Sequence, residues 1–225
     1  MKRFAIPELL DSDAGTAAEI KTSLSDLDRI NRWFGGISTT EALVANVARK
    51  LGASTLSLLE VAAGRGGTPE AVRGRMRRSD IQLRVTLLDR AASHLAHAGN
   101  GNVKVAGDAL ALPFADGAFD LVSCCLFVHH LSPDDLVRFV NEGLRVCRAA
   151  VLINDIIRHP LHLGLVYAGT PLYRSRITRH DAPASVRQAY TLEEISDLLK
   201  QTKAARVEIK RHFLFRMGVI AWKRA

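Results

Sequence analysis

The feature that most constrains the fold of this chain is a β-strand pattern that runs directly into a glycine-rich turn. Residues 55–61 read Thr-Leu-Ser-Leu-Leu-Glu-Val, and the next six residues read Ala-Ala-Gly-Arg-Gly-Gly. Thr68 and Pro69 then suit the first turn of a helix, where proline is tolerated. Small residues let a ligand approach the backbone, and a helix N-terminus offers unpaired N–H groups. The unit is therefore typical of a cofactor-binding strand, turn and helix.

Strand and helix patterns alternate after this unit. Further strands are predicted at residues 83–88, 103–106, 119–127 and 150–157. The nearly all-apolar run 119–127 is typical of a central parallel strand that is covered on both faces. Pro133-Asp134-Asp135 opens a helix that ends near Cys147. This alternation predicts an α/β fold with a parallel sheet and right-handed crossovers.

The two ends of the chain depart from this alternation. Residues 14–34 and about 38–51 predict two helices before the first strand. After a predicted helix at 192–200, residues 206–213 and 215–223 are two β-rich runs with almost nothing between them. Parallel neighbours need a long crossover, so one of these runs is expected to return antiparallel beside the other.

Length and composition predict one main domain. The chain has 225 residues, of which 48% are apolar and 24% charged, as in an ordinary globular protein. We expect an N-terminal helical cap at residues 1–52 and a main domain at 53–225. Residues 158–190 are too long for a typical connection and mix apolar residues with histidines, so we expect them to form a substrate-covering insertion.

The sequence shows no targeting or membrane-spanning pattern. Glu8 and Asp11 occur before any apolar signal region could form, and no apolar run of spanning length follows. The three cysteines form an odd set without a Cys-x-x-Cys pair, which favours a reducing, cytoplasmic location. A metal site is not expected, because Pro160 disrupts the helical pairing of His159 and His162 and no third ligand is evident.

The net charge of +8 raises the question of an acidic partner such as RNA or lipid. Basic residues gather in residues 200–225 and 158–190, but no compact stripe of aromatic and basic residues accompanies them. We interpret them as a solvated surface, and we do not expect nucleic acid as a partner.

The glycine turn by itself fits two kinds of cofactor site. Ala62, Gly64 and Gly67 could form a dinucleotide fingerprint in which the first glycine is replaced, and Asp89 at the end of the next strand could hold a ribose in either case. Glu60 at the strand tip favours a positively charged amino or sulfonium group, because it would repel a pyrophosphate. The helices before the first strand also differ from a dinucleotide domain, which commonly starts with its strand.

Further motifs complete a family pattern. They are Glu60-Val61-Ala62-Ala63-Gly64-Arg65-Gly66, Asp89, Gly107-Asp108-Ala109, and Phe119-Asp120-Leu121-Val122 followed by His129-His130-Leu131. Over residues 55–157 the chain resembles the class I S-adenosyl-L-methionine-dependent methyltransferases. The resemblance is closest to the small-molecule branch that includes the ubiquinone and menaquinone methyltransferases. It implies a Rossmann-like, mostly parallel seven-stranded sheet with an antiparallel last strand, helices on both faces, and S-adenosyl-L-methionine as cofactor.

The resemblance also implies roles for individual residues. Gly64 and Gly66 would flank the methionyl part of the cofactor, Asp89 would bind both ribose hydroxyls, and Asp108 would accept from the adenine amino group beside the backbone N–H of Ala109. The remaining expected cofactor-binding residues are Arg32, Glu60, Ala62, Arg90 and Cys125. Ala62 stands where the family most often has glycine. Arg32, beside a double glycine, could reach the cofactor carboxylate.

Candidate catalytic residues lie after the fourth and fifth strands and in the insertion. Methyl transfer requires an aligned nucleophile and, for some acceptors, removal of its proton. His129 would face the substrate cavity, while His130 supports the loop. Asp155 lies late in the fifth strand, and His180 with Asp181 forms a second candidate acid–base pair.

The sequence thus predicts methyl transfer to a small, lipophilic, phenolic or quinol acceptor at oxygen or carbon. Two alternatives remain open at this point. The glycine turn also fits a nicotinamide-dependent oxidoreductase, and the positive charge fits an RNA-modifying methyltransferase, although no base-flipping motif of the Asn-Pro-Pro-Tyr type is present. Neither the acceptor nor the oligomeric state follows from the sequence.

Overall fold

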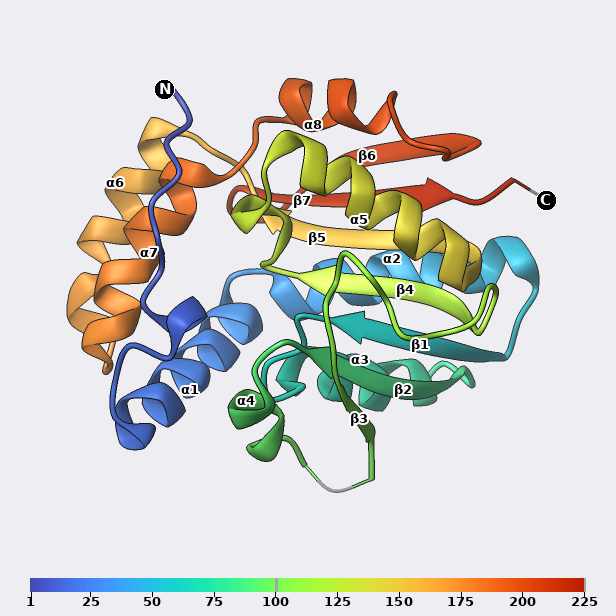
Figure 1. The fold of residues 1–225 in the computed structure, drawn as a ribbon, viewed down its shortest axis with the longest axis horizontal. Helices are drawn as coiled ribbons and strands as arrows, with labels where there is room; N and C mark the ends of the chain where they lie inside the picture. The colour runs from blue at the N-terminus through green and yellow to red at the C-terminus, as the bar shows by residue number, and fades with distance from the viewer. Residues whose placement is uncertain (100, 225) are drawn as a thin grey trace.

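The computed structural model describes residues 1–99 and 101–224, and its centre is one seven-stranded sheet (Figure 1). The strands are β1 (Thr55–Val61), β2 (Gln82–Asp89), β3 (Val103–Ala106), β4 (Phe119–Cys125), β5 (Cys147–Ile156), β6 (Arg206–His212) and β7 (Arg216–Trp222). Their order is β3-β2-β1-β4-β5-β7-β6. The first five strands pair in parallel, and β7 pairs antiparallel with both β5 and β6. This is the predicted class I methyltransferase arrangement.

Helices cover both faces of the sheet, and others lie at one end. They are α1 (Ala17–Trp33), α2 (Gly36–Leu51), α3 (Gly67–Arg77), α4 (Ala92–Ala96), α5 (Pro133–Val146), α6 (Pro160–Ala168), α7 (Arg176–Gln188) and α8 (Leu192–Leu199). The side chains of α2 and α3 share one buried cluster with β1, β2 and β5. Those of α5 and α8 share another with β4, β5 and β7. This two-sided burial explains the almost continuous apolar pattern of the central strands.

Local sequence signals account for where several helices begin. Thr16 caps α1 and Thr191 caps α8, each in a capping box with a glutamate three residues later. Ser132 caps α5, and its side chain accepts a hydrogen bond from the backbone N–H of Asp135. These caps are readable from sequence because they depend on residues only three positions apart.

The predicted strands agree with the observed ones to within a few residues. The largest difference is that β5 begins at Cys147 and not at Ala150. At the carboxyl ends the largest difference is at β4, which ends at Cys125 and not at Phe127. Leu126 has a φ of 56°, a left-handed backbone conformation that turns the chain out of the strand. The strand therefore stops at the edge of the sheet where the cavity described below opens.

Residues 158–190 fold as helices and not as an irregular loop. They form α6, a short 3₁₀ turn at Thr170–Leu172, and α7. In Figure 1 this pair lies with α1 and the N-terminal segment beyond the carboxyl ends of the parallel strands. No helix in the described part of the chain is both long enough and apolar enough to cross a membrane.

Candidate active site

A cavity of about 390 Å³ lies at the carboxyl ends of β1, β2 and β4. This is the edge at which open α/β sheets usually bind ligands, and the volume is in the usual range for small-molecule sites. Eight of the ten predicted cofactor-binding residues line it: Glu60, Ala62, Gly64, Asp89, Arg90, Asp108, Ala109 and Cys125. Gly66 and Arg32 do not line it. The fold thus gathers residues from the ends of four strands, β1, β2, β3 and β4, that are up to 65 positions apart in the sequence.

The glycine turn is tightly folded against β2. Ala62, Gly64 and Gly66 all have left-handed backbones, with φ of 54°, 54° and 74°. Gly66 supports the site from behind, because a Cβ there would lie 2.6 Å from Leu87 Cδ1. Its glycine is therefore required both by the backbone conformation and by packing.

Asp89 holds the turn in place. The backbone N–H of Gly64 donates to Asp89 Oδ2 (2.7 Å), and that of Ala91 donates to Asp89 Oδ1 (2.9 Å). Each carboxylate oxygen keeps a further lone pair that a ligand hydroxyl could use. Asp108 is exposed on the cavity wall, and its Oδ1 accepts from the backbone N–H of Leu110 at 2.9 Å.

Glu60 is a buried carboxylate with an unused oxygen. It is 1% exposed and lines the cavity, and its Oε2 has no hydrogen-bond partner among residues 1–99 and 101–224. Burial raises the pKa of Glu60 to about 7. A buried unpaired carboxylate is costly unless a donor or cation meets it. The site therefore fits the positively charged cofactor that the sequence implies.

Asn31, and not the neighbouring Arg32, faces the cavity from α1. Arg32 is exposed, so the expected contact with a cofactor carboxylate is not formed by the arrangement seen here. Asn31 Oδ1 accepts from Nη2 of Arg216 (2.7 Å), an arginine on β7 that is only 1% exposed. Arg216 also donates to Asn154 Oδ1 at 3.2 Å. A one-residue difference on a helix rotates a side chain by about 100°, which explains why Asn31 lines the cavity and Arg32 does not.

The N-terminal segment, residues 1–13, forms part of the cavity wall. It contributes Glu8, Leu10 and Asp11, and α1 adds four further residues. Of residues 158–190, which we expected to cover the substrate, only Ser185 lines the cavity. Nothing in the sequence indicated that the N-terminal segment reaches the site, because its contacts join residues more than 100 positions apart.

His129 lines the cavity and is held by Asp155. Asp155 does not line the cavity, and its Oδ1 lies 2.6 Å from His129 Nδ1. Burial disfavours the charged imidazole, but the charge of Asp155 and its hydrogen bond outweigh this and raise the pKa of His129 to about 10. His129 therefore keeps its proton in the free protein, which makes it a poor proton acceptor there.

His180 and Asp181 pair with each other but do not reach the cavity. His180 Nδ1 lies 2.8 Å from Asp181 Oδ1, while the His180 side chain is exposed. Asp181 instead accepts from the backbone N–H groups of Leu9 (2.9 Å) and Leu10 (3.0 Å). The fold thus uses Asp181 to fix the N-terminal segment, and the expected acid–base pair does not form at this site.

His159, His162 and the three cysteines have structural surroundings. His159 caps α6, and both His159 and His162 stack on Phe215 with ring centroids 5.1 Å apart. Cys124, Cys125 and Cys147 are free thiols. Burial raises the pKa of Cys125 to about 12, so its thiol stays protonated at the cavity wall.

Comparison with known proteins agrees with this geometry. Residues 59–153 match the family model described as a methyltransferase domain. A search of curated proteins by sequence found no match. Among solved structures, the fold is similar to the plantazolicin methyltransferase BpumL in complex with a monoazolic desmethylPZN analog and SAH. That similarity has a TM-score of 0.69 and 14% identity, over 96% of this chain and 93% of that one.

Two other structures show the same fold. Magnesium protoporphyrin IX methyltransferase from Synechocystis PCC 6803, with bound SAH, matches with a TM-score of 0.57 and 14% identity over 84% of each chain. The CurJ carbon methyltransferase matches with a TM-score of 0.61 and 13% identity, over 84% of this chain and 54% of that one. At these identities the likeness shows the fold.

The domain match and the fold define the class of the protein. Residues 59–153 are a methyltransferase domain, and they include β1, the glycine turn and the strand ends that form the cavity. The protein is an S-adenosyl-L-methionine-dependent methyltransferase. The glycine turn is therefore not that of a nicotinamide-dependent oxidoreductase.

Proposed function

We propose that the protein transfers a methyl group from S-adenosyl-L-methionine to a small-molecule acceptor bound between the glycine turn and His129. The observation that carries this proposal is the unpaired buried oxygen of Glu60, which faces a cavity bounded by the methyltransferase motifs. When bound, the cofactor supplies an electrophilic methyl group. The chain's own residues would bind and orient both molecules.

Each cofactor contact follows from the chemistry of the side chain. Asp89 would accept from the ribose hydroxyls with the lone pairs that Gly64 and Ala91 leave free. Glu60 would meet a positively charged group of the methionyl part, and Asp108 with the Ala109 backbone would hold the adenine. Arg65 lines the cavity and is a better candidate than Arg32 for the cofactor carboxylate.

The acceptor would lie beside His129, with Asp155 as its positioning residue. Leu126, Phe127 and Leu131 line the cavity beside His129, which favours an acceptor with an apolar body and one polar group. A phenolic or similarly acidic hydroxyl, or an acidic carbon, has these properties. The narrower resemblance to ubiquinone and menaquinone methyltransferases remains a prediction, as does the cytoplasmic location, for which three free thiols are the support.

Binding of S-adenosylhomocysteine to purified protein tests the cofactor half of the proposal. By calorimetry we expect one site per chain, and no comparable binding of NAD. Asp108→Ala should weaken binding roughly 10- to 100-fold, because a hydrogen bond to a charged group contributes about 1.5–3 kcal/mol. Asp116→Ala is a matched control on the exposed loop before β4. Binding of NAD without binding of S-adenosylhomocysteine would contradict the proposal.

Variants at the acceptor end test the other half. His129→Ala should leave S-adenosylhomocysteine affinity within about twofold, while turnover of an identified acceptor falls by about 100-fold because the acceptor is no longer held in position. Asp89→Ala, in contrast, should abolish S-adenosylhomocysteine binding itself. Equal loss of cofactor binding in both variants would place His129 in the cofactor site and not at the acceptor.

A further inference from the structure

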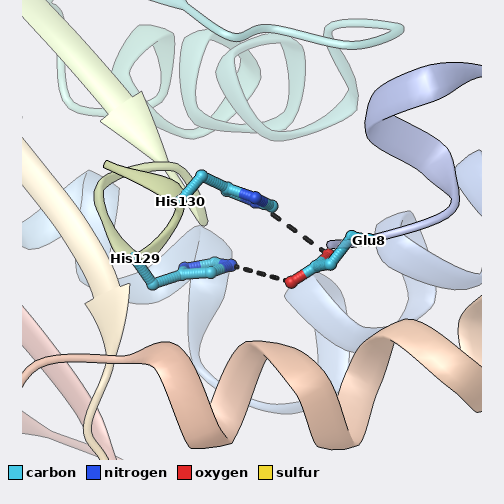
Figure 2. A group of neighbouring side chains, drawn as sticks. All are labelled: Glu8, His129 and His130. Carbon is cyan, nitrogen blue, oxygen red and sulfur yellow. Dashed lines mark ion pairs between the residues drawn. The ribbon is translucent and has the colours of Figure 1, made fainter. Parts of the chain in front are cut away.

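Beside the acceptor end of the cavity, Glu8, His129 and His130 form a compact cluster of possible metal ligands (Figure 2). One ligand atom from each residue lies within 4.8 Å of the others. Glu8 comes from the N-terminal segment, and the histidines come from a 3₁₀ turn, Val128–His130, that follows β4. All three residues line the cavity.

The two imidazole rings approach Glu8 at distances that do not suit direct hydrogen bonds. His129 Nε2 lies 3.7 Å from Glu8 Oε1, and His130 Nε2 lies 4.0 Å from Glu8 Oε2. Ligand atoms on a shared tetrahedral metal ion are about 3.4 Å apart when each bond is about 2.1 Å. These two separations exceed that value by about 0.3 and 0.6 Å, and all the ligand atoms lie within 4.8 Å of one another, so the side chains would have to draw together by up to about an ångström to hold an ion.

Each of the three side chains is fixed from behind by a second polar group. His129 Nδ1 lies 2.6 Å from Asp155 Oδ1, and His130 Nδ1 lies 2.9 Å from Asp11 Oδ2. A histidine that binds a metal through one nitrogen commonly donates its other N–H to a carboxylate in this way. Here both histidines do so, and both direct Nε2 toward the same carboxylate, as Figure 2 shows.

Glu8 is anchored as firmly as the histidines. Its Oε1 accepts from Ser185 Oγ and from Gln188 Nε2, both at 2.6 Å, so α7 fixes the carboxylate. These two donors leave Oε2 as the freer oxygen.

Charged groups of both signs surround the cluster. Three carboxylates, those of Glu8, Asp11 and Asp155, surround two imidazoles. The nearby guanidiniums of Arg3 and Arg90 donate to the backbone carbonyls of His129 and Asp11.

We propose that Glu8, His129 and His130 bind a divalent transition-metal ion whose open coordination positions face the cavity. Two imidazoles and one carboxylate are ligands that zinc and iron(II) accept, whereas magnesium and calcium prefer oxygen ligands alone. The site deepens the proposed function and rests on it, since an oxygen of the acceptor would complete the coordination. His129 then acts as a metal ligand and not as the base.

The reaction at such a site balances without a further co-reactant. A cation held by these residues would favour loss of the acceptor hydroxyl proton to water. The oxygen then forms a bond to the methyl carbon as the sulfur–methyl bond breaks, and that electron pair stays on sulfur as S-adenosylhomocysteine. A metal ion at this site would therefore favour an acceptor with an ionisable hydroxyl, or two adjacent oxygens, over a carbon acceptor.

Direct metal binding tests the inference without a known acceptor. Full-length protein freed of metal with a chelator should bind one Zn²⁺ per chain by calorimetry, and Zn²⁺ should raise its thermal unfolding midpoint. Glu8→Gln and His130→Ala should each weaken Zn²⁺ binding by at least about 10-fold. The matched controls Glu193→Gln and His97→Ala, both at exposed residues away from the cavity, should bind Zn²⁺ as the natural protein does.

The outcomes separate this inference from the proposed function. Binding of S-adenosylhomocysteine is measured in the same metal-free proteins, and we expect it to survive in Glu8→Gln and His130→Ala. Absent Zn²⁺ binding, or Zn²⁺ binding that both variants retain, overturns the metal site while leaving the cofactor site intact. Loss of S-adenosylhomocysteine binding in the natural protein overturns the proposed function. If one variant fails to fold, the other still decides.

Discussion

At the scale of single residues, Ala62 is an alanine in a backbone conformation that favours glycine, and this lowers the stability of the fold. The class I pattern most often has glycine here, and the φ of Ala62 is 54°. A left-handed backbone costs a residue with a Cβ about 1–2 kcal/mol, whereas glycine adopts it freely. The turn holds Ala62 in this conformation because Ala63 N–H donates to Leu88 O on the neighbouring strand.

Ala62→Gly should therefore stabilise the protein. We expect the free energy of unfolding to rise by about 0.5–1 kcal/mol, since relief of the backbone strain exceeds the added entropy of the unfolded glycine. Urea unfolding followed by circular dichroism measures the change. Ala63→Gly is the control, because Ala63 does not have a positive φ and should lose stability. A loss of stability in Ala62→Gly would show that the alanine methyl group makes contacts worth more than the strain.

Glu60 predicts a second effect at this scale, on the pH dependence of stability. Its pKa rises from 4.5 to about 7 on burial, so the folded protein holds a proton that the unfolded chain releases between these values. Stability should therefore fall as pH rises from about 4.5 to 7.

Glu60→Gln should not show this pH-dependent loss. Between pH 5 and pH 7.5 the free energy of unfolding of the natural protein should therefore fall by on the order of 2 kcal/mol relative to that of Glu60→Gln. Urea unfolding of both proteins across this range measures it. Glu193→Gln, at an exposed position in α8, should follow the natural protein throughout. Parallel curves for Glu60→Gln and the natural protein would mean that Glu60 does not titrate in this window.

At the scale of elements, the contact between the N-terminal segment and α7 completes the cavity wall. Asp181 on α7 accepts from the backbone N–H groups of Leu9 and Leu10, and Arg3 donates from the N-terminal segment to Gln188 O at 2.6 Å. These bonds keep Glu8 beside the histidines. The helix pair α6–α7 therefore supports the site indirectly, through a segment it holds.

Asp181→Ala should release this segment. The amides of Leu9 and Leu10 would lose hydrogen bonds to a charged group, which contribute about 1.5–3 kcal/mol each. Their hydrogen exchange should become at least about 10-fold faster, as measured by mass spectrometry of N-terminal peptides. Asp197→Ala, at an exposed position in α8, is the control. Unchanged exchange in Asp181→Ala would mean that the remaining contacts suffice to hold the segment.

Sequence patterns predicted the bounds of the strands and helices far better than the tertiary contacts that these elements make. Strands β1 and β3 have the predicted bounds, because a short alternating or apolar run between turn residues determines a strand locally. Residues 158–190, which we expect to form a substrate-covering insertion, are mostly helix, and His159 and Ser175 cap those helices. Their apolar residues suggested contact with a substrate, yet Leu161 and Leu165 are exposed.

At the scale of the whole molecule, a basic protein surrounds an acidic cavity. The net charge is +8, while Glu8, Asp11, Asp28, Glu60, Asp89 and Asp108 line the cavity with only two arginines, Arg65 and Arg90. Some basic residues on the surface are engaged in ion pairs. Lys50 and Arg206 both pair with Glu208, for example. The cavity therefore suits a cationic ligand, although the outer surface of the protein is basic.

Binding to RNA should accordingly be weak and non-specific. We expect single-stranded RNA to bind measurably at about 50 mM salt and to be released by about 150 mM, as simple charge attraction is. Fluorescence anisotropy of a labelled oligonucleotide measures this, with a polyanionic peptide as a comparison. Binding that persists at physiological salt and is specific to RNA would favour the RNA-modifying alternative.

The sequence by itself determined the sheet, the cofactor class and the residues at the strand ends. Glu60, Asp89 and Asp108 could be placed because parallel strands bring their carboxyl ends to one edge, so local position in the chain sets position in space. The tertiary structure alone decided that Asn31 and not Arg32 faces the cavity, that Asp181 fixes the N-terminal segment, and that Glu8 meets His129 and His130. Those contacts join residues far apart in the chain, and only the packing of α1 and α7 brings them together.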